Sequence, residues 1–273
     1  MDNNRRTIIK TGTAAALAAA VPSILKAQNT PDQIKIGVIG CGGRGSGALG
    51  QAMSADPNVI LWAIGDAFEG GIKNALGVGG RFKERMQAPK ERQFIGLDAY
   101  KGVIASGVDV VLLCTPPHFR PQHLRAAVEA GKHAFVEKPM AIDMPGIKSV
   151  IESAQMAKKK GTAIQHGYCW RYSPANRILF DQIHSGDLGR VVSIYGTYFA
   201  SPVAPLSNET KKPAGMGDVE FQTRYWQNFE WLNGSPLVEQ CIHIIDKVAW
   251  TMKDVAPIAA IANGGRSHRD DQS

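Results

Sequence analysis

The first residues with a chemical signature form the turn Gly40-Cys41-Gly42-Gly43-Arg44-Gly45, between an apolar run and a helical pattern. Glycines in such a GxGxxG pattern permit a sharp turn and a close approach to a pyrophosphate, which binds free N–H groups at the start of the helix. Asp66 ends the next apolar run, about twenty residues further on, where a carboxylate accepts hydrogen bonds from ribose hydroxyls. Together these residues predict a dinucleotide site, and the alternative is a glycine-rich surface turn. Asp66 repels a 2′-phosphate and so favours NAD over NADP, whereas Arg44 acts against this preference.

Two further polar segments end apolar runs. Cys114-Thr115-Pro116-Pro117-His118 closes one run, and Glu137-Lys138-Pro139 closes the next. Ligands of parallel sheets bind at the carboxyl ends of the strands, so Thr115, Pro116, His118, Glu137 and Lys138 stand where a ligand would bind. The alternative is a solvated lysine at a strand end.

Glu239 and His243 stand four residues apart in a helical pattern over 236–252. Residues at i and i+4 share one face of a helix, so the carboxylate is predicted to orient the imidazole. An imidazole has a suitable acidity for general acid–base catalysis near neutral pH. The alternative is a solvent-facing ion pair or a partly buried histidine with satisfied hydrogen bonds.

Apolar, β-branched runs alternate with helical patterns from Gln33 onward, which is typical of βαβ units with a parallel sheet. The runs 34–40 and 108–114 are apolar almost throughout, as strands covered on both faces must be. We therefore predict an α/β fold in which residues 33–167 form a doubly wound, Rossmann-type domain. The other predicted strands are 59–65, 92–95, 133–137 and 162–166, and the predicted helices are 45–54, 70–85, 97–106, 120–130 and 144–160.

Residues 168–265 have a different pattern and are predicted to form a second, α+β domain. Helices are expected over 174–184 and 236–252, and strands over 190–200 and 257–262. One long and one short strand make a poor sheet, so this domain is predicted to be incomplete. Residues 266–273 are polar and are predicted to form a disordered tail.

Residues 1–27 have the pattern of an export signal. The pair Arg5-Arg6 precedes an Ala-rich, weakly apolar stretch over 11–25, and a small residue, Ala27, follows. Paired arginines before a mild apolar region are typical of the twin-arginine route, and the alternative is an amphipathic N-terminal helix. We therefore expect a periplasmic or otherwise exported protein. A protein exported in its folded state carries with it a cofactor that it bound in the cytoplasm.

The composition excludes several classes of partner. The net charge of +7 arises partly in the export signal, and the other cations are not interleaved with aromatic residues as a nucleic-acid groove requires. No apolar run outside 1–27 is long enough to span a membrane. The four cysteines show no CxxC pair and are expected to be free thiols, mostly buried. His118, His123 and His133 lack carboxylates at ligand spacing, so no metal site is predicted.

The sequence Ala134-Phe135-Val136-Glu137-Lys138-Pro139-Met140-Ala141 resembles a signature of the Gfo/Idh/MocA oxidoreductase family. Three more segments are similar to this family, namely its cofactor-lining loop at 115–118, its domain crossover at 165–172 and its substrate-domain helix at 238–246. The resemblance runs from Ile34 to about Gly265. It implies that Lys138 is the catalytic lysine, that His243 is the histidine of the substrate helix, and that Glu239 replaces an aspartate of many members. Exported members with twin-arginine signals form a familiar subgroup.

The resemblance implies an enzyme that transfers hydride between a tightly bound NAD or NADP and a hydroxyl-bearing carbon of a sugar or polyol. Arg171 and Tyr172 are expected to bind or stack on the sugar ring, with packing as the alternative. In a second hypothesis, transient oxidation of a sugar carbon permits elimination of a glycosidic bond, so that the net reaction is hydrolysis. In a third, the chain is a C-terminally truncated relative that binds nucleotide without catalysis. The second domain of the family carries a broader sheet, and the unfinished sheet predicted here has an edge that favours pairing with a second copy.

Overall fold

The structure is a computed structural model that describes residues 33–201, 203–207 and 210–265. The predicted export signal (1–27) and the predicted tail (266–273) lie outside the described residues. Contacts divide the chain after Gln33, and the residues from Ile34 onward form one compact unit.

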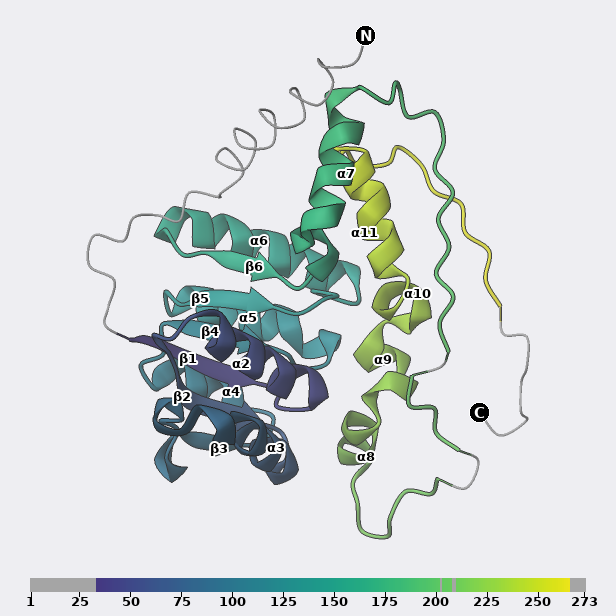
Figure 1. Cartoon of the computed structure of the whole chain (residues 1–273). Coiled ribbons are helices and arrows are strands. Elements are labelled where there is room, and N and C mark those ends of the chain that lie inside the picture. Colours follow the sequence, from purple (N-terminus) through teal and green to yellow (C-terminus); the bar gives the residue numbers. More distant parts are fainter. Residues whose placement is uncertain (1–32, 202, 208–209, 266–273) are drawn as a thin grey trace. The chain divides into compact units, whose positions relative to one another are not determined.

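A six-stranded parallel sheet organises the first half of this unit (Figure 1). The order β3-β2-β1-β4-β5-β6 changes direction beside β1, and the ligand site of such a sheet lies at that point, outside the carboxyl ends of the strands. The predicted Rossmann-type α/β fold is confirmed, and all six predicted strands are present. The strands are β1 (Ile34–Ile39), β2 (Val59–Asp66), β3 (Gln93–Ile95), β4 (Val110–Leu113), β5 (His133–Val136) and β6 (Ile164–His166).

Helices connect successive strands. The longest, α6, has a signal at each end: the Asp143 carboxylate accepts a hydrogen bond from the N–H of Gly146 (2.7 Å), and Gly161 ends the helix with φ +72°, a conformation that glycine adopts readily. The helix predicted over 70–85 is wrong as one element, because the α-helix gives way to a 3₁₀-helix at Gly79 and Gly80, and glycine weakens a helix. The helices are α2 (Gly43–Ala55), α3 (Glu69–Gly79), η1 (Gly80–Arg85), η2 (Lys90–Arg92), α4 (Ala99–Ala105), η3 (Pro117–Phe119), α5 (Arg120–Glu129) and α6 (Met144–Lys160).

Apolar side chains cover both faces of the sheet. Val111 and Leu113 of β4 belong to a core cluster with residues of α4, α5 and α6, whereas Leu112 belongs to a cluster with residues of α2 and α3. Alternate residues of a strand point to opposite faces, so a strand covered on both sides is apolar throughout. This packing holds the carboxyl ends of the central strands in place, and the polar residues of the predicted site begin there.

The described residues beyond β6 form helices and loops. Helices α7 and α11 lie side by side (Figure 1), and the rings of Phe180 and Trp250 stack with their centroids 3.8 Å apart. No helix among the described residues is both long and apolar enough to cross a membrane. The elements of this part are η4 (Cys169–Tyr172), α7 (Pro174–Ser185), α8 (Asp218–Arg224), η5 (Trp226–Asn228), α9 (Glu230–Asn233), α10 (Ser235–Glu239) and α11 (Ile242–Thr251).

Three predicted elements of this part are wrong. Residues 190–200 and 257–262 are not strands, and the helix predicted over 236–252 is two helices, α10 and α11. A strand needs a neighbour for its N–H and C=O groups, and neither segment pairs with another strand in the described part of the chain. Side chains such as Tyr195, Phe199 and Ile258 are instead almost fully exposed. The α+β pattern predicted for 168–265 is therefore replaced by helices and loops in the residues that are described.

Candidate active site

The glycine-rich turn between β1 and α2 has a conformation that requires glycine. Gly40 has φ +85°, and a Cβ atom there would lie 2.6 Å from the backbone nitrogen of Thr115. A Cβ atom on Gly45 would lie 1.8 Å from the backbone oxygen of Gly40. By contrast, nothing lies within 4 Å of the Cβ position of Gly42 or Gly43. The turn is thus closed toward the sheet and open on its outer side, as a phosphate-binding turn at a helix N-terminus must be.

Asp66, at the end of β2, braces this turn. Its Oδ2 atom accepts a hydrogen bond from the N–H of Cys41 (2.6 Å), and its Oδ1 atom accepts one from the N–H of Phe68 (2.8 Å). The carboxylate packs against Gly71, where a Cβ atom would lie 2.4 Å from it. Asp66 therefore fixes the glycine-rich turn and the start of α3, and each of its oxygens can accept a further hydrogen bond.

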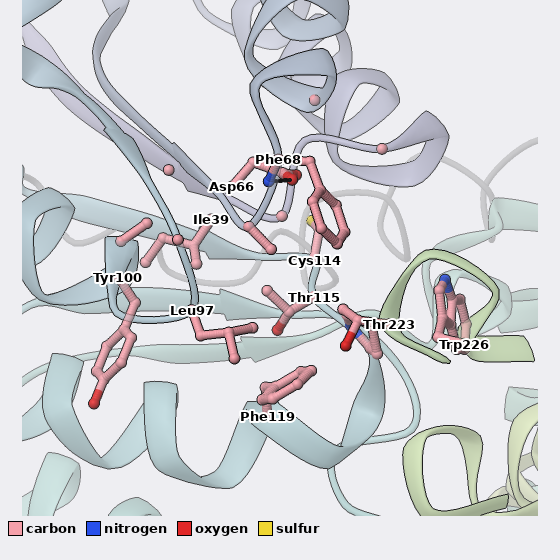
Figure 2. Close-up of a pocket in the computed structure, with 18 of the residues that line it drawn as sticks. Ile39, Asp66, Phe68, Leu97, Tyr100, Cys114, Thr115, Phe119, Thr223 and Trp226 are labelled. Atoms are coloured by element: carbon pink, nitrogen blue, oxygen red, sulfur yellow. Dashed lines mark hydrogen bonds between the residues drawn. The ribbon is translucent and has the colours of Figure 1, made fainter. Parts of the chain in front are cut away.

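A cavity of about 520 Å³ lies at the carboxyl ends of the strands, between the glycine-rich turn and α3 (Figure 2). The predicted residues Gly40, Gly42, Asp66, Thr115 and Pro116 line it. Sequence reasoning missed its apolar walls, although Phe68 and Leu97 each follow a strand end by two positions. A largely apolar lining with a few polar groups is typical of a small-molecule site. Its missed lining includes Phe68, Leu97, Tyr100 and Phe119 from the first half of the unit, and residues 223–226 from the second half.

Buried His123 stands behind Thr115. The Nδ1 atom of His123 lies 3.3 Å from Oγ1 of Thr115, and its ring stacks on Tyr100 with centroids 4.3 Å apart. Burial, assisted by the charge of Arg120, lowers the pKa of His123 to about 4, so the ring is neutral at neutral pH. His118 packs edge-on against Trp231 (5.1 Å) and is not among the residues that line the cavity.

An ion pair joins the glycine-rich turn to the end of β5. Nε of Arg44 lies 2.7 Å from Oε1 of buried Glu137, and Nη2 of Arg44 donates a hydrogen bond to Gln51 (2.8 Å). Glu137 therefore faces the glycine-rich turn, the side on which the cofactor was predicted. Arg44 is engaged by Glu137, so its charge is partly neutralised before it meets a 2′-phosphate.

Lys138 follows Glu137 and reaches into the second half of the unit. Its Nζ atom donates to Oε1 of Glu239 (2.9 Å) and to the backbone oxygen of the same residue (2.7 Å). The other carboxylate oxygen of Glu239 accepts a hydrogen bond from the side chain of Gln240 (2.6 Å). An ammonium group has three N–H donors, so Glu239 uses two of them and holds the third in a defined direction.

His243 lies near this pair, but not in the predicted way. Glu239 ends α10 and His243 is the second residue of α11, so they do not share one continuous helix, and Glu239 bonds to Lys138 and Gln240 instead. Burial and the positive charge of Lys138 lower the pKa of His243, while the charge of Glu239 acts in the opposite direction. The imidazole is therefore neutral at neutral pH and able to accept a proton.

Arg171, which was predicted to bind a sugar, is engaged in an ion-pair cluster. Its guanidinium contacts Asp246 (Nε to Oδ1, 2.8 Å) and Asp254 (Nη2 to Oδ1, 2.6 Å), and it lies over the ring of Trp250. These contacts raise the pKa of Arg171 and lower that of Asp254. Arg171 thus connects η4 to α11 through Asp246 and to the segment after α11 through Asp254. Tyr172 is exposed beside Arg177.

Arg120 is a buried cation that sequence reasoning missed. Its Nη1 atom donates to the backbone oxygen of Pro139 (2.5 Å), and its Nε atom has no hydrogen-bond partner among the described residues. Burial lowers the pKa of Arg120 to about 10, so it remains charged at neutral pH. Through its hydrogen bond to Pro139, Arg120 stabilises the loop that carries Lys138.

All four cysteines lie among the described residues, and so do His118, His123 and His133. All four cysteines are free; Cys41 is buried, Cys114 and Cys241 are half-buried, and Cys169 is exposed. Burial raises the pKa of the Cys114 thiol to about 12, so it is not an activated nucleophile. No group of three or more His, Cys, Asp or Glu residues within the described ranges is placed to hold a metal ion.

Comparison with known proteins defines the class of the first half of the unit. Residues 34–168 match the Gfo/Idh/MocA family, which is described as an oxidoreductase family with an NAD-binding Rossmann fold. This segment carries the glycine-rich turn, Asp66 and Lys138. The segment is therefore similar to the NAD-binding Rossmann domain of that family.

Individual relatives match part of the chain. An inositol 2-dehydrogenase of Paracoccus denitrificans (strain Pd 1222) is 30% identical over 141 residues, which are 52% of this chain and 38% of that protein. A glycosyl hydrolase family 109 protein of Shewanella pealeana (strain ATCC 700345 / ANG-SQ1) is 29% identical over 130 residues, which are 47% of this chain and 27% of that protein. The matched region is thus less than half the length of either relative. A solved structure of levoglucosan dehydrogenase with NADH and levoglucosan has a TM-score of 0.59 at 24% identity, covering 80% of this chain and 54% of that one, which shows a shared fold.

Proposed function

We propose that this protein is an NAD(P)-dependent oxidoreductase that transfers hydride between the nicotinamide and a hydroxyl-bearing carbon of a sugar or polyol. The observation that carries the proposal is the position of Lys138, which is hydrogen-bonded to Glu239 and directly follows Glu137, the partner of Arg44 in the glycine-rich turn. The similarity to an inositol 2-dehydrogenase supports a polyol-like substrate. Asp66 favours NAD over NADP.

The chain's own residues divide the work on the reacting hydroxyl. The nicotinamide, when bound, supplies the acceptor or donor of two electrons. The free N–H of the Lys138 ammonium binds the substrate oxygen, and its charge stabilises the alkoxide that develops there. His243 is neutral because its pKa is lowered, so a nitrogen of its imidazole accepts the hydroxyl proton. Glu239 holds Lys138 in this direction.

A second outcome uses the same first step. Oxidation of a sugar carbon acidifies the neighbouring C–H, a glycosidic bond is eliminated, water adds, and hydride returns, so that the net reaction is hydrolysis. The similarity to a glycosyl hydrolase family 109 protein favours this outcome. We also propose that the protein is exported to the periplasm. Both outcomes agree with this, because an exported protein must keep and recycle its nucleotide. Pairing with a second copy is also part of the proposal.

A substrate screen tests the proposal. The purified protein is incubated with polyols, monosaccharides and chromogenic glycosides, with and without added NAD or NADP. Formation of reduced nicotinamide with a sugar or polyol supports the oxidoreductase. Release of the chromophore without added nucleotide supports hydrolysis. Nucleotide binding without turnover of any compound contradicts both and favours a non-catalytic nucleotide-binding protein.

A further inference from the structure

One wall of the nucleotide cavity comes from the second half of the unit, at the end of α8. We propose that Arg224 and Thr223 of this helix bind the dinucleotide, Arg224 as the counter-charge for an anionic group and Thr223 as a hydrogen-bond partner. The inference rests on the proposed function only in taking the cavity ligand to be NAD or NADP. It assigns a nucleotide-binding role to residues that lie outside the segment 34–168 matched by the family.

The charge of the cavity points to Arg224. Among the described residues that line it, Asp66 and Arg224 carry the only full charges, since His123 is neutral at neutral pH. A dinucleotide brings two negative charges on its pyrophosphate, and NADP adds a 2′-phosphate. Helix N–H groups bind these oxygens. The guanidinium of Arg224, although paired with Glu220, adds a positive charge and further N–H donors.

Arg224 is already held in place over the cavity wall. Its guanidinium carbon lies 3.9 Å from the ring centroid of Phe68, two residues after Asp66. Its Nε and Nη2 atoms contact Oε1 of Glu220, one helical turn earlier, at 3.0 and 2.8 Å. Nothing in the described part of the chain accepts a hydrogen bond from its Nη1 atom. The side chain is therefore held through Nε and Nη2, and its Nη1 atom is available to a ligand. Because the side chain is already held, less conformational entropy is lost on binding.

Thr223 supplies the second observation. It lines the cavity together with Asp66, Thr115 and Phe119 (Figure 2), it is only 6% exposed, and its Oγ1 atom has no hydrogen-bond partner among the described residues. A buried hydroxyl without a partner is costly, and it calls for an explanation. We expect this hydroxyl to form a hydrogen bond with a polar group of the nucleotide when the nucleotide occupies the cavity.

Paired variants test this inference by titration of NAD and of NADP into the purified protein. We expect Arg224→Ala and Thr223→Val each to weaken binding about tenfold, and Arg224→Lys and Thr223→Ser to bind more tightly than these. Thr223→Val removes the unpartnered hydroxyl, so its melting temperature without nucleotide is expected to equal or exceed that of the wild type. A purely structural role would not combine higher stability with weaker binding. Arg125→Ala is the matched control, because Arg125 of α5 also pairs with a glutamate one helical turn away, Glu129, and does not line the cavity.

The outcomes separate this inference from the proposed function. Equal losses for NAD and NADP assign Arg224 to a group that both share, and a loss confined to NADP assigns it to the 2′-phosphate; both results support the inference. Wild-type affinity for both nucleotides in Arg224→Ala and Thr223→Val overturns it and leaves the proposed function standing. A wild-type protein that binds neither nucleotide contradicts the proposed function itself, and the inference with it.

Discussion

Nζ of Lys138 lies 2.9 Å from Oε1 of Glu239, although the two residues are 101 positions apart in the sequence. Lys138 follows the end of β5, and Glu239 ends α10, so the pair joins the Rossmann sheet to the helices of the second half of the unit. Only 15% and 17% of the two side chains are exposed. The pair is therefore unlike the solvated surface ion pairs that contribute little, and it fixes the direction in which the lysine presents its remaining N–H.

Substitution of Lys138 separates chemistry from nucleotide binding. Lys138→Met removes the charge that stabilises the developing alkoxide, so we expect kcat to fall by about 10²–10⁴. The affinity for NAD is expected to stay within about twofold, because the glycine-rich turn and Asp66 are untouched. Steady-state kinetics and calorimetry measure the two quantities, with Lys101→Met, a substitution of an exposed lysine on α4, as control. Loss of nucleotide binding together with turnover contradicts the role given to Lys138.

Glu239→Gln is expected to move the acid limb of the pH profile of kcat to lower pH. The charge of Glu239 raises the pKa of His243 against the effects of burial and of Lys138, so its removal lowers that pKa further. Catalysis requires the neutral imidazole, so activity persists to a lower pH, while kcat itself falls because Lys138 loses its partner. An acid limb that moves to higher pH, or does not move, would show that His243 is not the base.

Buried His123 is expected to make the fold less stable in acid. Its pKa is about 4 in the folded protein and about 6.5 in the unfolded chain, so between these values the unfolded chain binds more protons. The contribution of His123 to the free energy of unfolding is therefore complete above pH 6.5. It is lost as the pH drops toward 4, which lowers the free energy of unfolding by at most about 3 kcal/mol. Denaturant titrations across this range test the sign.

Two variants test whether His123 causes this pH dependence. His123→Asn keeps a polar atom near Thr115 but does not titrate, so its free energy of unfolding is expected to vary less between pH 6.5 and 4. His133→Asn changes an exposed histidine and is expected to leave the slope unchanged. A slope that survives in His123→Asn would assign the acid sensitivity to other groups.

Arg171 is expected to matter for stability. Arg171→Ala leaves the buried carboxylate of Asp246 unpaired, so the free energy of unfolding falls by about 3 kcal/mol. Asp254 is 58% exposed, and Asp254→Asn is expected to cost less than about 1 kcal/mol. Urea unfolding measures both values. If Arg171 also binds the sugar, a conservative Arg171→Lys change raises KM without a matching loss of stability, which would support the role predicted from the sequence.

The fold of the first half was predictable because its signals are local. The runs that became β1 and β4 are apolar almost throughout, with Lys35 and Asp109 as the exceptions, a pattern typical of strands covered on both faces. The segment 190–200 has an equally clear strand pattern, but a strand also needs a partner, which a pattern within the segment does not supply. The break between α10 and α11 also escaped prediction, because no proline or glycine marks it.

The part of the site that is encoded by a local motif was also predictable. Gly40, Gly45 and Asp66 belong to one spaced motif, and the structure brings them together within a single βαβ unit. Arg224 and Arg120 reach their positions through packing across the chain. Arg224 stacks on Phe68 from another part of the sequence, and Arg120 binds a carbonyl on the loop after β5. No spacing rule within the sequence connects such residues.

The identity of the bound small molecule is the most direct test of the account. The protein is purified without added nucleotide and denatured, and the released molecules are identified and quantified by mass spectrometry. We expect NAD or NADP at close to one molecule per chain. A protein that releases neither nucleotide, and that also fails to bind either when they are added, would contradict the nucleotide site and the catalytic roles built on it.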